Sequence, residues 1–184
     1  MSNLTNLQDR NAAFARSGAH REVPAIPFIP REHLYVITCI DPRVDPAAFL
    51  GLQLGDAIVA RDVGGRVTPE VIRDVSYISH LVQTKATDGP WFEVAVIHHT
   101  DCGSGLLADD TLRHDFGHRM GLDERTLTDT AVLDPERTVR TDVARLRWAP
   151  TISPAVRVSG HVYDVGTGLV HTVVDAAGAD AIEG

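Results

Sequence analysis

Three short runs of apolar, mostly β-branched residues stand out in the first half of the chain: His33–Ile40, Ala57–Ala60 and Phe92–Ile97. Each run is continuous rather than alternating in polarity, which predicts strands covered on both faces, as in a parallel sheet. Between the second and third runs, Pro69–Gln83 has apolar residues at helical spacing, and Thr68 is its predicted N-cap. The order strand, helix, strand predicts a right-handed crossover connection.

The remaining segments complete an α/β fold with a mostly parallel central β-sheet flanked by helices. We expect a helix at Asn3–Arg16, an extended proline-rich arm at Glu22–Arg31, an irregular helix at Ser104–Gly121, a polar connector at Asp123–Asp134, an amphipathic helix at Pro135–Trp148, and a hairpin made by Val156–Val165 and Leu169–Val174. The domain organisation predicted is an N-terminal helix and arm at 1–32, one domain at 33–175 and a frayed tail at 176–184.

Composition narrows the functional classes. A chain of 184 residues suits one domain, and a net charge of −8 without a basic cluster argues against nucleic acid as a partner. No apolar run is long enough to cross a membrane, and the polar first residues show no secretory signal, so we expect a cytoplasmic protein. Only two cysteines are present, Cys39 and Cys102, which argues against a disulfide scaffold.

Polar clusters follow each of the three predicted parallel strands. They are Cys39-Ile40-Asp41-Pro42-Arg43, Arg61-Asp62-Val63-Gly64-Gly65-Arg66 and His98-His99-Thr100-Asp101-Cys102-Gly103. Ligands bind outside the carboxyl ends of strands in open parallel sheets. The three clusters should therefore meet at one edge, with the two cysteines as neighbours.

Cys39, His99 and Cys102 form a donor set typical of zinc. His99 and Cys102 have metal-ligand spacing, and Cys39 adds a third soft ligand from another strand. Catalytic zinc keeps three protein ligands and one open position, whereas structural zinc sites have four. The sequence thus predicts one catalytic Zn²⁺ that lowers the pKa of bound water to about 7.

Asp41 and Arg43 lie next to this set. One interpretation is a solvated surface ion pair; the other, which we favour, is that Arg43 holds Asp41 away from the metal and leaves the fourth position to water. Gly64 and Gly103 could offer backbone N–H donors to substrate, or they could be ordinary turn glycines. His98 should point to the opposite face of its strand and be a packed histidine.

These motifs resemble those of the β-class carbonic anhydrases. That family has a CxDxR motif and an HxxC motif, which correspond here to Cys39–Arg43 and His99–Cys102. The resemblance extends from about Leu34 to about Val173, and the short chain is similar to the compact bacterial members. It implies zinc on Cys39, His99 and Cys102, with Asp41 and Arg43 as the catalytic pair. It also implies a homodimer or homotetramer built partly by exchange of N-terminal arms.

The chain departs from the family pattern at a few positions. Asp62-Val63 replaces the usual Asn-Ala, and Pro42 replaces a small residue. The tryptophan that some members use to bind regulatory bicarbonate is Val36 here, so we expect no such site.

Four functions remain to be compared. The first is reversible hydration of CO2 to bicarbonate by zinc-bound hydroxide. The second is hydrolysis of carbonyl sulfide or carbon disulfide, also small molecules, on the same zinc site. The third is a non-catalytic zinc-binding protein, and the fourth is a redox protein that closes a Cys39–Cys102 disulfide. The Asp41–Arg43 pair beside an open metal position would have no purpose in the last two.

Overall fold

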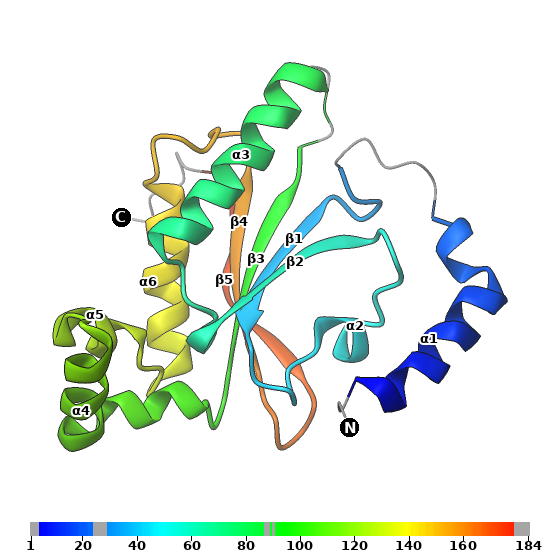
Figure 1. The fold of residues 1–184 in the computed structure, drawn as a ribbon. Helices are drawn as coiled ribbons and strands as arrows, with labels where there is room; N and C mark the ends of the chain where they lie inside the picture. The colour runs from blue at the N-terminus through cyan, green and yellow to red at the C-terminus, as the bar shows by residue number, and fades with distance from the viewer. Residues whose placement is uncertain (1–3, 24–28, 87–88, 90, 179–184) are drawn as a thin grey trace.

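The computed structural model describes residues 4–86, 89 and 91–178 except 24–28, and it has a single five-stranded sheet (Figure 1). The strand order is β2-β1-β3-β4-β5, in which β1, β2, β3 and β4 run parallel and β5 pairs antiparallel with β4. The strands are β1 (Leu34–Cys39), β2 (Ala57–Asp62), β3 (Glu93–His99), β4 (Arg157–Tyr163) and β5 (Val170–Ala177). The α/β fold with a mostly parallel sheet is confirmed, as is the hairpin.

Two long helices, α3 (Pro69–Lys85) and α6 (Pro135–Arg147), cover one side of the sheet (Figure 1). Both begin with proline after a capping side chain: the Thr68 hydroxyl accepts from Val71 N–H, and the Asp134 carboxylate accepts from Arg137 N–H. The core lies between these helices and the sheet and consists mainly of valine, isoleucine and leucine. Short α2 (Pro46–Phe49) and N-terminal α1 (Thr5–Ser17) lie on the other side.

The prediction of a polar connector at Asp123–Asp134 is wrong. Helix α5 (Glu124–Thr130) occupies most of it, capped by the Asp123 carboxylate, which accepts from Thr126 N–H. Leu127 is the one large apolar side chain of this helix and it is buried. A single apolar residue gives no helical periodicity, so the capping residue was the only available signal.

The segment after β3 contains two helices rather than one irregular helix. A 3-10 helix, η3 (Gly103–Ala108), precedes α4 (Asp110–Met120), and Asp109 caps the second by accepting from Leu112 N–H. Another 3-10 turn, η2 (Val63–Gly65), directly follows β2. Both 3-10 segments begin at the carboxyl edge of the sheet, where the candidate site residues lie.

The ends of the chain bear on the predicted domain limits. The N-terminal helix is present as α1 and is followed by the short η1 (Ala19–Arg21), but the centre of the predicted arm, 24–28, lies outside the described residues. Strand β5 continues to Ala177, past the predicted start of the tail at 176, and residues 179–184 are likewise not described. Within the described chain, no helix combines the length and apolar character that crossing a membrane requires.

Candidate metal centre

Three side chains that could bind a metal ion meet at the carboxyl edge of the sheet, and they come from two segments of the chain. Cys39 is the last residue of β1, His99 is the last residue of β3, and Cys102 follows three residues later. Their ligand atoms all lie within 4.8 Å of one another, and the two sulfurs are 3.9 Å apart. The predicted convergence of the strand ends is therefore present in the structure, and the two cysteines are neighbours.

His99 is oriented as a metal ligand. Its ring is 1% exposed, and its Nδ1 lies 2.9 Å from the Thr100 carbonyl oxygen, an acceptor that assigns the ring proton to Nδ1. The Nε2 atom is buried and has no hydrogen-bond partner within the described part of the chain. A buried, unpartnered ring nitrogen is costly unless something else binds it. Together with two sulfurs it makes an N/S donor set that zinc fits.

The backbone between the two HxxC ligands turns sharply. Asp101 has a left-handed φ of 54°, which aspartate tolerates better than most residues. The hydrogen bond between the sulfurs raises the pKa of Cys39 and lowers the pKa of Cys102. Without a metal the pair therefore favours one thiolate, on Cys102, whereas a metal bound to both sulfurs would require that Cys39 also lose its proton.

Asp41 is fixed by Arg43 through a two-pronged ion pair. Arg43 Nε donates to Asp41 Oδ1 at 3.0 Å and Nη2 donates to Oδ2 at 2.7 Å, while the Arg43 backbone N–H also reaches Oδ1 at 2.9 Å. These contacts lower the pKa of Asp41 to about 2. The same guanidinium donates to the Asp101 carboxylate at 2.8 Å and to the Asp101 carbonyl at 2.9 Å. Arg43 thus connects the CxDxR segment to the HxxC segment.

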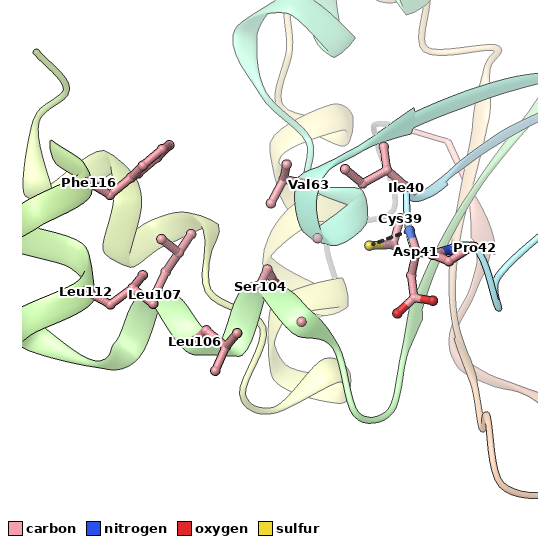
Figure 2. A pocket seen from close by; sticks show the side chains of 12 residues that line it. Cys39, Ile40, Asp41, Pro42, Val63, Ser104, Leu106, Leu107, Leu112 and Phe116 are labelled. Carbon is pink, nitrogen blue, oxygen red and sulfur yellow. Dashed lines mark hydrogen bonds between the residues drawn. The ribbon is translucent and has the colours of Figure 1, made fainter. Parts of the chain in front are cut away.

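A pocket of about 500 Å³ opens beside Cys39 and Asp41 (Figure 2). Gly64 and Gly103 both line this pocket, and donation from their N–H groups to a substrate stays a prediction. The wall opposite Asp41 is apolar and comes from η3 and α4: Leu106, Leu107, Leu112 and Phe116. Sequence reasoning missed this wall because α4 is mostly polar and shows little apolar periodicity.

Comparison with known proteins decides the family. The family model for carbonic anhydrase matches residues 34–119. β-Carbonic anhydrase 1 of Mycobacterium tuberculosis is 30% identical over 148 residues, which cover 80% of this chain and 86% of that protein. This chain belongs to the β-carbonic anhydrase family.

Two further relatives are named for different activities. The crystal structure of a carbonic anhydrase from Streptococcus mutans is similar with a TM-score of 0.71 and 33% identity, covering 94% of this chain and 98% of that one. A carbon disulfide hydrolase of Acidianus is 30% identical over 172 residues, covering 81% of this chain and 80% of that protein. The family relationship therefore fits two chemistries.

The η2 glycines give the metal centre its close packing. A Cβ on Gly65 would lie 2.8 Å from the Cys39 backbone nitrogen, and the φ of Gly65 is +65°. A Cβ on Gly64, whose φ is +82°, would lie 3.1 Å from the Ser104 hydroxyl. Glycine is therefore required at both positions, for space and for backbone conformation.

Behind these glycines lies a buried polar network that the sequence analysis did not find. The Asp142 carboxylate of α6 accepts from Arg66 Nε at 2.6 Å and from Val67 N–H at 3.2 Å, and it lies 3.2 Å from His98 Nε2. His98 is completely buried and also contacts Thr138, which confirms its predicted packing role. Burial would raise the pKa of Asp142, but bonds to His98 and Arg66 lower it to about 2.

The signal for this network was available in α6. Asp142 lies among Val139, Val143 and Leu146, so a carboxylate occupies the apolar face of an amphipathic helix. A buried carboxylate needs a charged partner. The sequence alone could not say that the partner is Arg66, 76 residues away.

Asp62 has a different environment from Asp41. Its Oδ1 accepts from Arg66 N–H at 2.7 Å, whereas Oδ2 is buried without a partner among the described residues. Burial raises the pKa of Asp62 to about 6. An asparagine at this position would carry no charge, so an ionised Asp62 costs free energy at neutral pH.

Proposed function

We propose that this chain is a zinc enzyme that reversibly hydrates CO2 to bicarbonate. The observation that carries the proposal is an open three-ligand set, Cys39, His99 and Cys102, beside a carboxylate that Arg43 already holds. The two thiolates and His99 Nε2 would hold one Zn²⁺, which supplies a Lewis acid that lowers the pKa of water to about 7.

Asp41 would act directly on the attacking water, and Arg43 would hold Asp41 in place. With its pKa lowered to about 2, Asp41 is ionised throughout the neutral range and accepts a hydrogen bond from the attacking water, which aims a lone pair at the carbon of CO2. Arg43 occupies both oxygens of Asp41, which keeps this carboxylate in place as an acceptor rather than as a fourth metal ligand.

Carbonyl sulfide or carbon disulfide hydrolysis is the second candidate. The pocket wall of Leu106, Leu107, Leu112 and Phe116 has no polar side chain to prefer CO2 over a less polar thiocarbonyl compound. The carbon disulfide hydrolase of Acidianus has the same percentage identity to this chain, 30%, as the mycobacterial carbonic anhydrase. The residues acting on water would be the same in both reactions.

We also propose a homodimer or homotetramer in the cytoplasm. Leu7 and Phe14 of α1 are 46% and 41% exposed, so this helix presents apolar side chains that a second subunit would cover. Light scattering tests this point: a monomer at micromolar concentration would contradict it.

A paired assay on the zinc-loaded protein tests the function. Stopped-flow CO2 hydration and sulfide release from carbonyl sulfide are measured for the wild type, for Asp41→Ala and for Asp115→Ala, an exposed carboxylate of α4 that serves as control. We expect CO2 turnover that falls about 100-fold or more in Asp41→Ala and is unchanged in Asp115→Ala.

Other outcomes select other functions. Sulfide release with negligible CO2 turnover would exclude the first candidate and support the second. Neither activity, with full zinc content, would support a non-catalytic zinc protein. Absence of zinc together with an oxidised Cys39–Cys102 pair would support a redox role.

A further inference from the structure

Ser104 contacts the metal centre without being one of its ligands. It lies in η3 two residues after Cys102, is 7% exposed, and lines the pocket (Figure 2). Its hydroxyl oxygen is 3.1 Å from Cys102 Sγ and 3.2 Å from the Val132 backbone nitrogen. The side chain thus joins a metal-ligating sulfur to the start of the segment before α6.

The donor and the acceptor in each of the two Ser104 hydrogen bonds can be assigned from the hydrogens that the groups carry. Val132 N–H can only donate, so it donates to the Ser104 oxygen, and the one hydroxyl hydrogen of Ser104 is left for a different acceptor. Cys102 Sγ is the other contact recorded for this hydroxyl within the described residues. A metal-ligating cysteine is a thiolate, which only accepts, so the O–H of Ser104 donates to sulfur.

Packing holds Ser104 in this position. A Cβ on Gly64 would come within 3.1 Å of the Ser104 hydroxyl, so the glycine provides the space that the hydroxyl occupies. With Val132 N–H on one side and Gly64 on another, the side chain has little freedom to turn away from Cys102. The packing therefore restricts the Ser104 side chain to the rotamer that contacts Cys102.

The two sulfurs then receive one donor each. Cys39 Sγ accepts from the Asp41 backbone N–H at 3.4 Å, and Cys102 Sγ accepts from the Ser104 hydroxyl. Two thiolates place more negative charge on a metal than imidazole ligands do, which would make bound water less acidic. A hydrogen bond withdraws charge from a thiolate and fixes its direction, so these donors offset part of that effect.

We propose that Ser104 is a positioning residue that tunes the Cys102 thiolate by donating a hydrogen bond to it. The inference rests on the proposed zinc site but not on which substrate is used there. Unlike the backbone donor on Cys39, this donor can be removed by mutation, which makes the proposal testable on the whole protein.

The test compares Ser104→Ala with Ser104→Thr, which retains the hydroxyl, and with Ser79→Ala. Ser79 is a fully buried serine of α3, and its hydroxyl accepts from Ser153 N–H at 3.0 Å. Because α3 contributes none of the three proposed metal ligands, Ser79→Ala controls for loss of a backbone acceptor. The readouts are zinc affinity by chelator competition and the wavelength of the thiolate-to-metal charge-transfer band in cobalt-substituted protein.

We expect zinc affinity to fall about 10-fold to 100-fold in Ser104→Ala, as for other residues that orient metal ligands. The charge-transfer band should move to longer wavelength, because the sulfur lone pairs rise in energy when the hydrogen bond is lost. Ser104→Thr should keep the wild-type band, and Ser79→Ala should change neither readout.

Weaker zinc binding with an unshifted band would make Ser104 merely structural and overturn the proposal. An unchanged affinity and band, or a Ser104→Thr band matching that of Ser104→Ala, would also overturn it. If the wild type itself shows no thiolate-to-cobalt band, the zinc site fails and the inference about Ser104 fails with it.

Discussion

Two carboxylates at the same sheet edge have opposite environments at the scale of single residues. The Arg43 guanidinium lowers the pKa of Asp41 to about 2, while burial raises the pKa of Asp62 to about 6. Asp41 is thus ionised at neutral pH and can accept hydrogen bonds. Asp62 is also ionised at neutral pH, but its charge is buried and lowers the free energy of unfolding. The difference arises from partners: Asp41 has both oxygens bonded, and Asp62 has one oxygen with no partner among the described residues.

Replacing Asp62 with asparagine should stabilise the protein at neutral pH. Because the folded-state pKa of Asp62 is above its unfolded value, folding favours the protonated form, and stability falls as pH rises from about 4 through 6. Asp62→Asn removes this charge and should raise the free energy of unfolding by about 1–2 kcal/mol at pH 7.5. Urea unfolding of the metal-free protein at pH 7.5 and pH 5 measures the difference, because a bound cation beside Cys39 would itself lower the pKa of Asp62.

The gain should be smaller at pH 5 than at pH 7.5, because Asp62 is then mostly protonated in the wild type. A gain that is equal at both pH values, or a loss of stability at pH 7.5, would show that Asp62 is not a buried, costly charge.

Single residues were also the scale at which the sequence was most informative. Cys39, His99 and Cys102 could be predicted because each follows or ends an apolar run, and strand ends converge in parallel sheets. Ser104 could not be assigned, because its role depends on Val132 and Gly64, which approach it only through the loops of the folded chain. Spacing in sequence carries no information on such loop contacts.

At the scale of elements, the turn η2 allows the chain that leaves β2 to pass close to the candidate metal centre. Gly64 and Gly65 both have positive φ, and Gly65 lies against the backbone of β1. The parallel register places Cys39 beside Asp62, so the chain leaving β2 must turn directly behind a predicted metal ligand. The apolar runs predicted β1, β2 and β3, but the 3-10 geometry of this turn has no periodic signal.

Gly65→Ala should disrupt the metal centre, and Gly121→Ala provides a matched control. Both glycines have similar φ, +65° and +63°, but a Cβ on Gly121 meets nothing within 4 Å. The left-handed conformation costs both variants about 1–2 kcal/mol. Gly65→Ala should lose about 1–3 kcal/mol more, because its Cβ meets the Cys39 backbone nitrogen at 2.8 Å.

Thermal unfolding and zinc content measure this difference. We expect zinc content to fall in Gly65→Ala and to stay near one per chain in Gly121→Ala. Equal stabilities and equal zinc contents would contradict the close packing of η2 against Cys39.

At the scale of the whole molecule, Asp142 connects the helical layer to the site. From α6 it bonds to Arg66 after η2 and to His98 of β3, the residue before the predicted metal ligand His99. The fold class could be predicted because the continuous apolar runs indicate the strands and the amphipathic segments indicate the long helices. The short helix α5 could not be predicted, because it has only one large apolar residue. Long-range polar contacts such as those of Asp142 could not be predicted from the sequence either, because two charged residues can pair whatever the number of residues between them.

Asp142→Ala should destabilise the protein strongly. Removing one partner of a buried ion pair leaves Arg66 uncompensated and costs about 3–5 kcal/mol. The exposed pair of Arg73 and Asp74, 3.9 Å apart, is the control, and Asp74→Ala should change stability by about 0–1 kcal/mol. Urea unfolding at pH 7 compares the two variants.

The pH dependence has a defined sign. The folded-state pKa of Asp142 is below its unfolded value, so its contribution is complete above about pH 4 and is lost as pH falls toward 2. Equal effects of Asp142→Ala and Asp74→Ala at pH 7 would contradict a structural role for the network.

The measurement that tests the central claim most directly is zinc X-ray absorption on the metal-loaded protein, with metal content determined on the same sample. One zinc per chain is expected, with two sulfur ligands and one imidazole nitrogen from the protein and a further light-atom neighbour. In Cys102→Ser one sulfur should disappear. Zinc well below one per chain, or a sulfur count that Cys102→Ser leaves unchanged, would contradict the open site formed by Cys39, His99 and Cys102.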